Sequence, residues 1–192
     1  MATRASGRST REAIHAAASR LFRERGYART PVRDIAALAE VNPALVIRYF
    51  GSKEELFLET MRLTIDDEPL LDVPIERFGE RFVNVVLSSD QDIVDVYLAL
   101  VRGSGEQRIA ERLREVHEDS LVAPLRTRLS RVDTAGCADP ADADLRARMA
   151  AAVVGGLLYS VWVAGDHTLA RQRDALVRRY GAIVQDIITP GG

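Results

Sequence analysis

The chain has 192 residues, of which 47% are apolar and 28% are charged, so it can bury a core and is not a disordered polypeptide. The formal net charge of −2 argues against a surface that binds a polyanion everywhere, and a single cysteine, Cys137, excludes an intramolecular disulfide. The N-terminus lacks the apolar segment of a signal peptide, and we therefore expect a protein of the reducing cytoplasm.

The charge is unevenly distributed along the chain. Residues 1–53 carry ten Arg or Lys side chains and four acidic ones, a net charge of +6, whereas the remaining residues carry −8. A basic N-terminal region on an acidic body predicts that only the N-terminal region meets a polyanion such as DNA.

Apolar residues recur with helical spacing throughout and strand signals are missing, so the fold class is predicted to be all-α. A first helix is predicted from Ser9, which has the capping-box spacing with Glu12, to about Gly26. A second begins at Thr30-Pro31, with Thr30 as its cap and Pro31 where the missing N–H costs nothing. Its predicted apolar stripe is Ile35, Leu38 and Ala39.

Asn42-Pro43 repeats the same start signal only three residues after Ala39. Two short helices joined by so brief a turn must cross steeply, which is the geometry of a helix-turn-helix. A fourth helix is predicted to begin at Ser52, with Glu55 in the capping-box position, and to run toward Asp67.

The third helix, residues 43–50, is predicted to place different side chains on its two faces. Val46 and Phe50, flanked by Pro43 and Ile47, are expected to face the first two helices, and the opposite side suits the major groove of DNA. Lys53, the only lysine, is interpreted as a phosphate clamp at the start of the fourth helix. The predicted DNA-contacting residues are Thr30, Arg33, Asn42, Ala44, Leu45, Arg48, Tyr49 and Lys53. Each of these taken alone is also compatible with a solvated helix surface.

The stretch REAIHAAASRLFRERGYARTPVRDIAALAEVNPALVIRYFGSKEELF, residues 11–57, closely resembles the DNA-binding domain of TetR-family transcriptional regulators. The resemblance implies a homodimer that binds a near-palindromic DNA operator and a C-terminal domain that binds a small-molecule effector, with repression as the expected outcome. Two positions depart from the family pattern. Glu40 stands where many members have Gly, and Ile47 stands where many have Tyr.

Three segments are predicted: a helix-turn-helix domain at 1–53, a connecting helix and linker at 54–73, and a helical effector-binding and dimerisation domain at 74–192. The boundary is the stretch EPLLDVP, residues 68–74, with its two prolines. Pro124 is expected to kink or divide the helix that contains it. The helices predicted after the boundary span about 74–88, 91–102, 105–132, 141–166 and 170–188.

Residues 149–164, MAAAVVGGLLYSVWVA, are nearly all apolar but too few to cross a bilayer. A helix that is apolar all round is buried on several sides, and a second subunit is the expected cover, in a four-helix dimer interface formed by the last two helices. Packing inside a single chain is the alternative. The predicted interface residues are Val153, Gly155, Gly156, Leu157, Leu176, Tyr180, Ile183, Val184 and Ile187.

An apolar effector pocket with a few polar groups is predicted in the C-terminal domain on the analogy of the family. Ordinary core packing is the alternative for each candidate residue. The candidates are Phe78, Phe82, Tyr97, Val101, His117, Leu121, Met149, Tyr159 and Trp162.

Other classes of function find little support in the sequence. The three histidines are far apart, and neither a catalytic nor a phosphate-loop motif is present, so we expect no enzyme, no metal site and no cofactor. A DNA-binding module without an effector, controlled by a partner, is the second alternative. The aromatic-containing C-terminal region argues against it.

Overall fold

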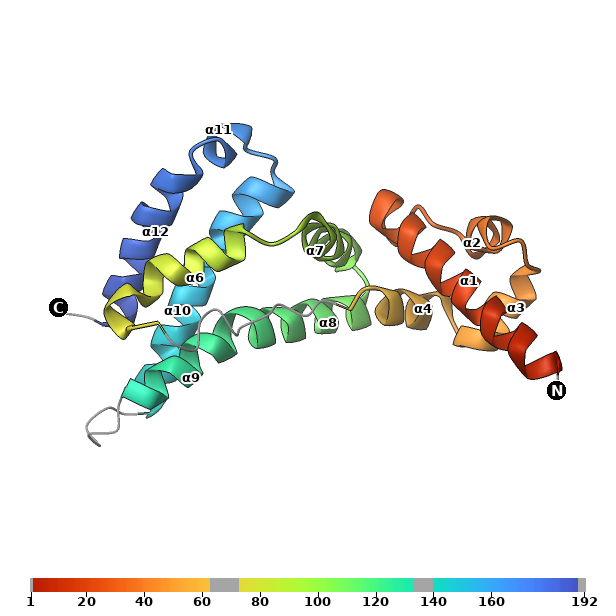
Figure 1. The fold of residues 1–192 in the computed structure, drawn as a ribbon, viewed down its shortest axis with the longest axis horizontal. Helices are drawn as coiled ribbons and strands as arrows, with labels where there is room; N and C mark the ends of the chain where they lie inside the picture. The colour runs from red at the N-terminus through yellow and green to blue at the C-terminus, as the bar shows by residue number, and fades with distance from the viewer. Residues whose placement is uncertain (1, 63–72, 133–139, 190–192) are drawn as a thin grey trace. The chain divides into compact units, whose positions relative to one another are not determined.

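The computed structural model describes residues 2–62, 73–132 and 140–189, and every regular element within those ranges is a helix (Figure 1). The predicted all-α fold is therefore confirmed. In chain order the elements are α1 (Ala2–Arg25), α2 (Val32–Leu38), α3 (Pro43–Phe50), α4 (Lys53–Thr60), η1 (Ile75–Arg77), α6 (Phe78–Leu87), α7 (Gln91–Gly103), α8 (Gln107–His117), η2 (Glu118–Val122), α9 (Ala123–Val132), α10 (Pro140–Leu158), η3 (Tyr159–Val163), α11 (His167–Ala170) and α12 (Arg173–Ile188).

Contacts between Cα atoms divide the chain into two units. The first unit contains residues 1–63 and 92–114, and the second contains residues 64–91 and 115–192. Nearly all of α7 and most of α8 thus belong to the same unit as the N-terminal helices, although the sequence assigned them to the C-terminal domain. The division at 1–53, 54–73 and 74–192 stays a prediction, and most of EPLLDVP, like Cys137, lies outside the described residues.

The first unit is built around the buried face of α1. Phe22 packs edge-on against Phe57 of α4 with 5.0 Å between ring centroids, and Tyr27 packs edge-on against the same Phe57 at 5.3 Å. The side chains that complete this core share almost complete burial and are Ile14, Ala17, Ala18, Leu21, Ile35, Ala36, Val46, Phe50, Leu56 and Met61. Val46 and Phe50, predicted to face inward from the helix at 43–50, are buried on α3, which confirms that prediction.

Two helix boundaries in this unit differ from those predicted. The first helix begins at Ala2, so the predicted cap at Ser9 is wrong; alanine and arginine upstream of Ser9 are good helix formers, and the helix continues through them. The fourth helix begins as predicted, because the Ser52 side chain accepts a hydrogen bond from the Glu55 N–H at 3.0 Å. It ends at Thr60 and not near Asp67.

In the second unit, α6 and α12 lie side by side and cross at two glycines (Figure 1). A Cβ atom on Gly79 would lie 2.3 Å from the carbonyl oxygen of Gly181, and a Cβ atom on Gly181 would lie 2.7 Å from the Cα atom of Glu80. Only glycine fits at either position. The side chain of Gln185 stabilises the crossing, since its Oε1 accepts from the Gly79 N–H at 3.0 Å and its Nε2 donates to the Ile75 carbonyl at 2.9 Å.

The long helices of this unit are interrupted by π-helical turns. η2 separates α8 from α9, whose second residue is Pro124, and this confirms the predicted division. Proline has no N–H to donate, and the wider turn places it at the start of a new helix. A second π turn, η3, ends the helix predicted at 141–166. Asp166 then caps α11, accepting hydrogen bonds from the N–H groups of Thr168 and Leu169 at 3.0 Å each.

Four charged side chains join η2, α9 and α10 in a closed ring of ion pairs. Arg126 bonds to Asp144 at 2.6 Å and to Glu118 at 2.5 Å, while Arg148 bonds to Asp144 at 2.8 Å and to Glu118 at 3.0 Å. The hydrogen bond from Arg126 holds the pKa of Glu118 below its usual value. Among the described residues, no helix is long and apolar enough to cross a membrane.

Candidate nucleic-acid interface

The turn between α2 and α3 carries the helix-turn-helix. The N–H of Val41 donates to the Ala36 carbonyl at 2.9 Å and the N–H of Glu40 donates to the Ala37 carbonyl at 3.3 Å. These two bonds form a Schellman motif, which places Glu40 in the left-handed region with φ of 55°. Glycine is the residue best suited to that conformation, so the family's preference for Gly at this position has a physical cause.

Asn42 and Pro43 set the start of α3. The Asn42 side-chain oxygen accepts a hydrogen bond from the Ala44 N–H at 2.9 Å, and Pro43 occupies the first turn. The predicted start of the helix is therefore confirmed. Because its side-chain oxygen caps the helix, Asn42 stabilises α3, and this role does not depend on any DNA contact made by its exposed amide group.

The exposed face of α3 differs from the prediction in two residues, Ile47 and Pro43, which were both expected to face the first two helices. Ala44 and Arg48 are exposed as predicted, while Leu45 and Tyr49 are half-buried. Ile47 was expected to face the core, but 44% of it is exposed. That expectation was wrong because Ile47 lies 100° around the helix from Val46, outside the narrow arc that a helix of eight residues buries. Pro43 is also exposed.

Most arginines of the first unit are paired with carboxylates. Arg11, Arg20, Arg23 and Arg25 form ion pairs with Glu59, Glu24, Asp92 and Asp34 at distances of 2.6 to 3.2 Å. The side chain of Arg33 is 84% exposed, and its Nε lies 3.5 Å from Asp34.

Four further arginines in this unit are exposed and have no hydrogen bond or ion pair with any described residue: Arg29 and Arg48 within residues 1–53, and Arg62 and Arg102 outside them. An arginine without a partner can bind a phosphate at the lowest cost in free energy, because no existing ion pair must be broken. The sequence had indicated Arg29 only through the total charge of residues 1–53.

Thr30 does not have its predicted role. Its side chain is fully buried, and its hydroxyl donates toward the carbonyl oxygens of Gly26 at 2.8 Å and Leu21 at 3.3 Å. The residue that precedes α2 is Pro31, and no side chain caps this helix. The predicted cap at Thr30 is therefore wrong, and its hydroxyl ties the turn to the end of α1 instead of facing outward.

Lys53 is also directed inward. Its Nζ donates to the carbonyl oxygen of Tyr27 at 3.0 Å and lies 3.9 Å from the centre of the Tyr27 ring. Burial lowers the pKa of Lys53, and the negative charge of Glu106 acts in the opposite direction. The lysine interpreted as a phosphate clamp thus has a partner within its own unit.

The nine residues predicted to line an effector pocket do not share one environment. Phe78, Phe82 and Leu121 are buried in the core of the second unit, with the two rings stacked at 5.9 Å. Met149 and Tyr159 are about half exposed, at 49% and 56%. The other four are half-buried: His117 and Trp162 in the second unit, Tyr97 and Val101 on α7 in the first.

Two surface pockets, one beside α6 and one between α1 and α2, are lined by none of the nine. In the described ranges, no group of three His, Cys, Asp or Glu side chains could hold a metal ion.

A tight turn between two short helices and an exposed α3 that carries the unpaired Arg48 define a helix-turn-helix DNA-binding protein. Comparison with known proteins agrees. Residues 14–60 match the family described as bacterial regulatory proteins, tetR family, and residues 76–188 match the family described as tetracyclin repressor-like, C-terminal domain. The chain belongs to the TetR family of transcriptional regulators, which are DNA-binding transcription factors and not enzymes.

Relatives extend the match over most of the chain. Over 157 residues, this chain is 32% identical to the HTH-type transcriptional regulator BetI of Agrobacterium fabrum. The match covers 77% of this chain and 74% of that protein. A segment of 44 residues is 57% identical to an HTH-type transcriptional repressor of Mycobacterium tuberculosis, and this match spans only 23% of either chain.

Solved structures share the fold. The structure of NalD from Pseudomonas aeruginosa, described as the secondary repressor of the MexAB-OprM multidrug efflux pump, matches with a TM-score of 0.66 at 20% identity, over 95% of this chain and 98% of that one. Salmonella enterica GusR matches with a TM-score of 0.68 at 22% identity, over 93% and 95%. At these identities the likeness concerns the fold alone.

Proposed function

We propose that this regulator is a cytoplasmic, homodimeric repressor that binds a near-palindromic operator and is released by a small, largely apolar effector. The observation that carries the DNA-binding part is the exposed face of α3, where Arg48 has no partner among the described residues and small Ala44 permits close approach. An arginine in the major groove bonds to guanine or to phosphate, and an aliphatic side chain contacts the thymine methyl group. Ile47 joins Leu45 in that second role because it is exposed.

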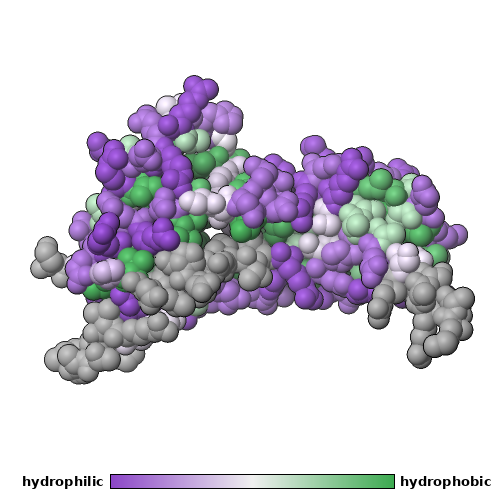
Figure 2. All heavy atoms as spheres, viewed as in Figure 1, coloured by the Kyte–Doolittle hydropathy of each residue, from purple (hydrophilic) through white to green (hydrophobic). Residues whose placement is uncertain are grey.

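The homodimer is supported by an apolar stripe on α10. Apolar side chains interrupt the mainly hydrophilic surface (Figure 2). Leu145, Met149, Ala152 and Gly156 of α10 and Tyr159, the first residue of η3, follow one another at alternating intervals of four and three residues, which aligns them along one side of the helix. Leu145, Met149 and Tyr159 are 56%, 49% and 56% exposed, and a Cβ atom on the intervening Gly156 would meet nothing within 4 Å. An apolar stripe of this length is characteristic of a surface that a partner covers.

Several residues predicted for this interface lie elsewhere. Leu157, Leu176 and Val184 are 1%, 6% and 0% exposed and belong to the core of their own unit, so their side chains do not reach a second copy. A Cβ atom on Gly155 would lie 3.6 Å from the His117 ring, so this glycine packs within the chain. The surface proposed instead combines the α10 stripe with Ile183 of α12, which is 46% exposed, and Gly156 is retained. Val153, Tyr180 and Ile187 are half-buried at its margin.

Effector release is supported by the family and by half-buried aromatic and imidazole side chains in the second unit. Trp162, the only tryptophan, packs partly buried against the core there. A ligand near it would change its fluorescence, and by thermodynamic reciprocity the operator would lower the affinity for an effector by the factor by which the effector lowers the affinity for the operator.

The proposal is tested by selecting bound sequences from random duplex DNA with wild type, Ile47→Ala and Arg48→Ala. An exposed arginine of the second unit, Arg171→Ala, is the matched control. We expect wild type and Arg171→Ala to select one two-fold symmetric site, and Ile47→Ala to change its base preference by roughly 1–3 kcal/mol at one position of each half-site. Identical selection by all four proteins would place base reading outside α3.

Effector control is tested with the selected site and a panel of apolar molecules. Those that alter Trp162 fluorescence should also release the operator. If every fluorescence-active ligand leaves operator affinity unchanged, the regulator is controlled by a partner and not by an apolar effector.

A further inference from the structure

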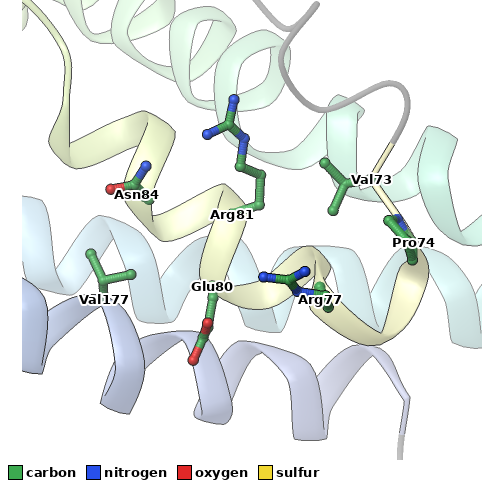
Figure 3. Close-up of a pocket in the computed structure, with 7 residues that line it drawn as sticks. All are labelled: Val73, Pro74, Arg77, Glu80, Arg81, Asn84 and Val177. Atoms are coloured by element: carbon green, nitrogen blue, oxygen red, sulfur yellow. The ribbon is translucent and has the colours of Figure 1, made fainter.

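A groove with a volume of about 380 Å³ runs beside α6 in the second unit. Figure 3 shows its lining residues: Val73, Pro74, Arg77, Glu80, Arg81, Asn84 and Val177. The volume falls in the range of small-molecule sites in proteins. None of these residues was among those predicted for an effector pocket, so the groove is a separate feature of the fold.

The groove concentrates positive charge. Arg77, the last residue of η1, and Arg81 of α6 are one helical turn apart, a spacing at which like charges repel each other. Arg77 is exposed, and its guanidinium has no hydrogen bond or ion pair with any described residue. The one acidic lining residue, Glu80, has its stem against Gly181, and its carboxylate points toward α12, in the opposite direction from the Arg81 guanidinium (Figure 3). No ion pair joins Glu80 to Arg77, so the charge of Arg77 is not neutralised by the one acidic residue of the lining.

Neighbouring hydrogen bonds fix the rims of the groove. Arg128 donates to the carbonyl oxygen of Val73 at one end. At the other end, Arg173 donates to the Asn84 carbonyl at 3.2 Å and to the Ser88 hydroxyl. These two arginines add to the positive potential and hold the lining backbone in place, so a ligand would find the site largely formed.

Three of the lining residues are aliphatic, and the groove lies away from the proposed dimer surface. Val73, Pro74 and Val177 offer apolar contact next to the arginines. Val177 lies on the flank of α12 that also holds Gly181 against α6, whereas Ile183 lies about 120° around the helix. A second copy covering Ile183 would leave the groove accessible.

We propose that this groove binds a small molecule with a carboxylate head and a short aliphatic chain. The unpaired guanidinium of Arg77 can form a bidentate pair with the carboxylate, and Arg81 and Asn84 lie within the same lining. Val73, Val177 and Pro74 contact the aliphatic chain of the ligand. This binding does not depend on the proposed effector control, because it requires no change in operator affinity.

The experiment is calorimetric titration of the full chain with hexanoate, 1-hexanol and hexylamine, which share the aliphatic chain and differ in the head group. We expect hexanoate to bind at one site per chain and the alcohol and amine to bind at least about tenfold more weakly, since a hydrogen bond to a charged group is lost. R77Q should weaken hexanoate binding by a similar factor, and R77K, which keeps the charge but not the planar fork, should weaken it less.

R171Q, which removes an exposed arginine outside the groove, is the matched control and should bind hexanoate as wild type does. Because Arg77 is exposed, these substitutions leave the core intact, and circular dichroism verifies the fold. Equal affinity for the three molecules, no binding of hexanoate, or hexanoate binding that R77Q leaves unchanged would each overturn the proposal.

Discussion

The ammonium group of Lys53 is held by Tyr27, which accepts its hydrogen bond through the backbone carbonyl at 3.0 Å and presents its ring at 3.9 Å. The pair joins the start of α4 to the loop that follows α1, and so fixes two of the elements that frame the helix-turn-helix. Burial raises the pKa of the Tyr27 phenol, with the carboxylates of Glu54 and Glu106 adding to the effect. The contact between Lys53 and Tyr27 is therefore part of the internal structure of the first unit.

This relationship predicts that Lys53 contributes mainly to the stability of the fold, whereas Arg48 contributes mainly to DNA binding. Lys53→Met should lower the free energy of unfolding by about 1–2 kcal/mol, since it removes a hydrogen bond and a cation–π contact. It should leave the salt dependence of operator binding unchanged. Arg48→Ala should leave stability nearly unchanged and, if Arg48 bonds to phosphate, reduce the slope of log affinity against log salt by about 1. Urea unfolding measures the stability, and binding titrations at several salt concentrations measure the slope. A smaller slope for Lys53→Met would indicate that Lys53 does contact a phosphate.

Glu40 is a position where stability can be gained. A residue with a Cβ atom in the left-handed region costs about 1 kcal/mol relative to glycine, and both Schellman hydrogen bonds are already in place. Glu40→Gly should therefore raise the free energy of unfolding by about that amount. Glu40→Ala is the control: it removes the charge and keeps the Cβ atom, and it should give little gain. Equal stabilisation by both variants would indicate that charge and not backbone strain is the cause.

The sequence predicted best those features whose signals are local. Asn42-Pro43 and Ser52 were identified as helix starts because the capping partners of Asn42 and Ser52 lie two and three residues away. The roles of Thr30 and Lys53 could not be predicted in this way. The Lys53 acceptor is 26 residues distant, and helical spacing carries no information about which cations are already paired.

Apolar periodicity in the C-terminal helices left a different ambiguity. On α10, Leu157 and Met149 are both apolar, yet one is 1% exposed and the other 49%. A helix that is apolar on several sides does not reveal which side its own chain covers, so pocket, core and interface residues were predicted together and had to be separated by their burial. For this reason Phe82, predicted for the pocket, and Val184, predicted for the interface, are found in the core, whereas Tyr159, predicted for the pocket, is found at the surface.

His117 predicts a pH dependence of stability. It packs beside Gly155, and burial lowers its pKa; the nearby carboxylate of Glu118 opposes that shift, and the Arg148 guanidinium adds to it. The folded-state pKa therefore lies below the ordinary value of 6.5, and between the two values the unfolded chain binds more protons. The free energy of unfolding should rise with pH through this window and fall as the solution is acidified below about 6.5.

Chemical unfolding at pH 7.5 and pH 5.5 measures this effect. His117→Gln should make the difference between the two pH values smaller than in wild type. His167→Gln, at an exposed position, is the matched control and should retain the wild-type difference. A pH dependence unchanged by His117→Gln would remove this imidazole as its source.

The α10 stripe predicts how the proposed dimer can be dissociated without unfolding the chain. Met149 is exposed in the single chain, so Met149→Asp removes no core contact there, whereas in a dimer it would bury a carboxylate in an apolar surface at a cost of several kcal/mol. Sedimentation should show a monomer with wild-type helical content, and operator affinity should fall steeply because two half-sites are no longer bound together. Leu38→Asp is the matched control: Leu38 is 44% exposed on α2, and its replacement should leave the dimer intact. If Met149→Asp remains a dimer, the second copy binds at a surface other than the one that runs from Leu145 to Tyr159, and the exposed stripe then requires a different partner.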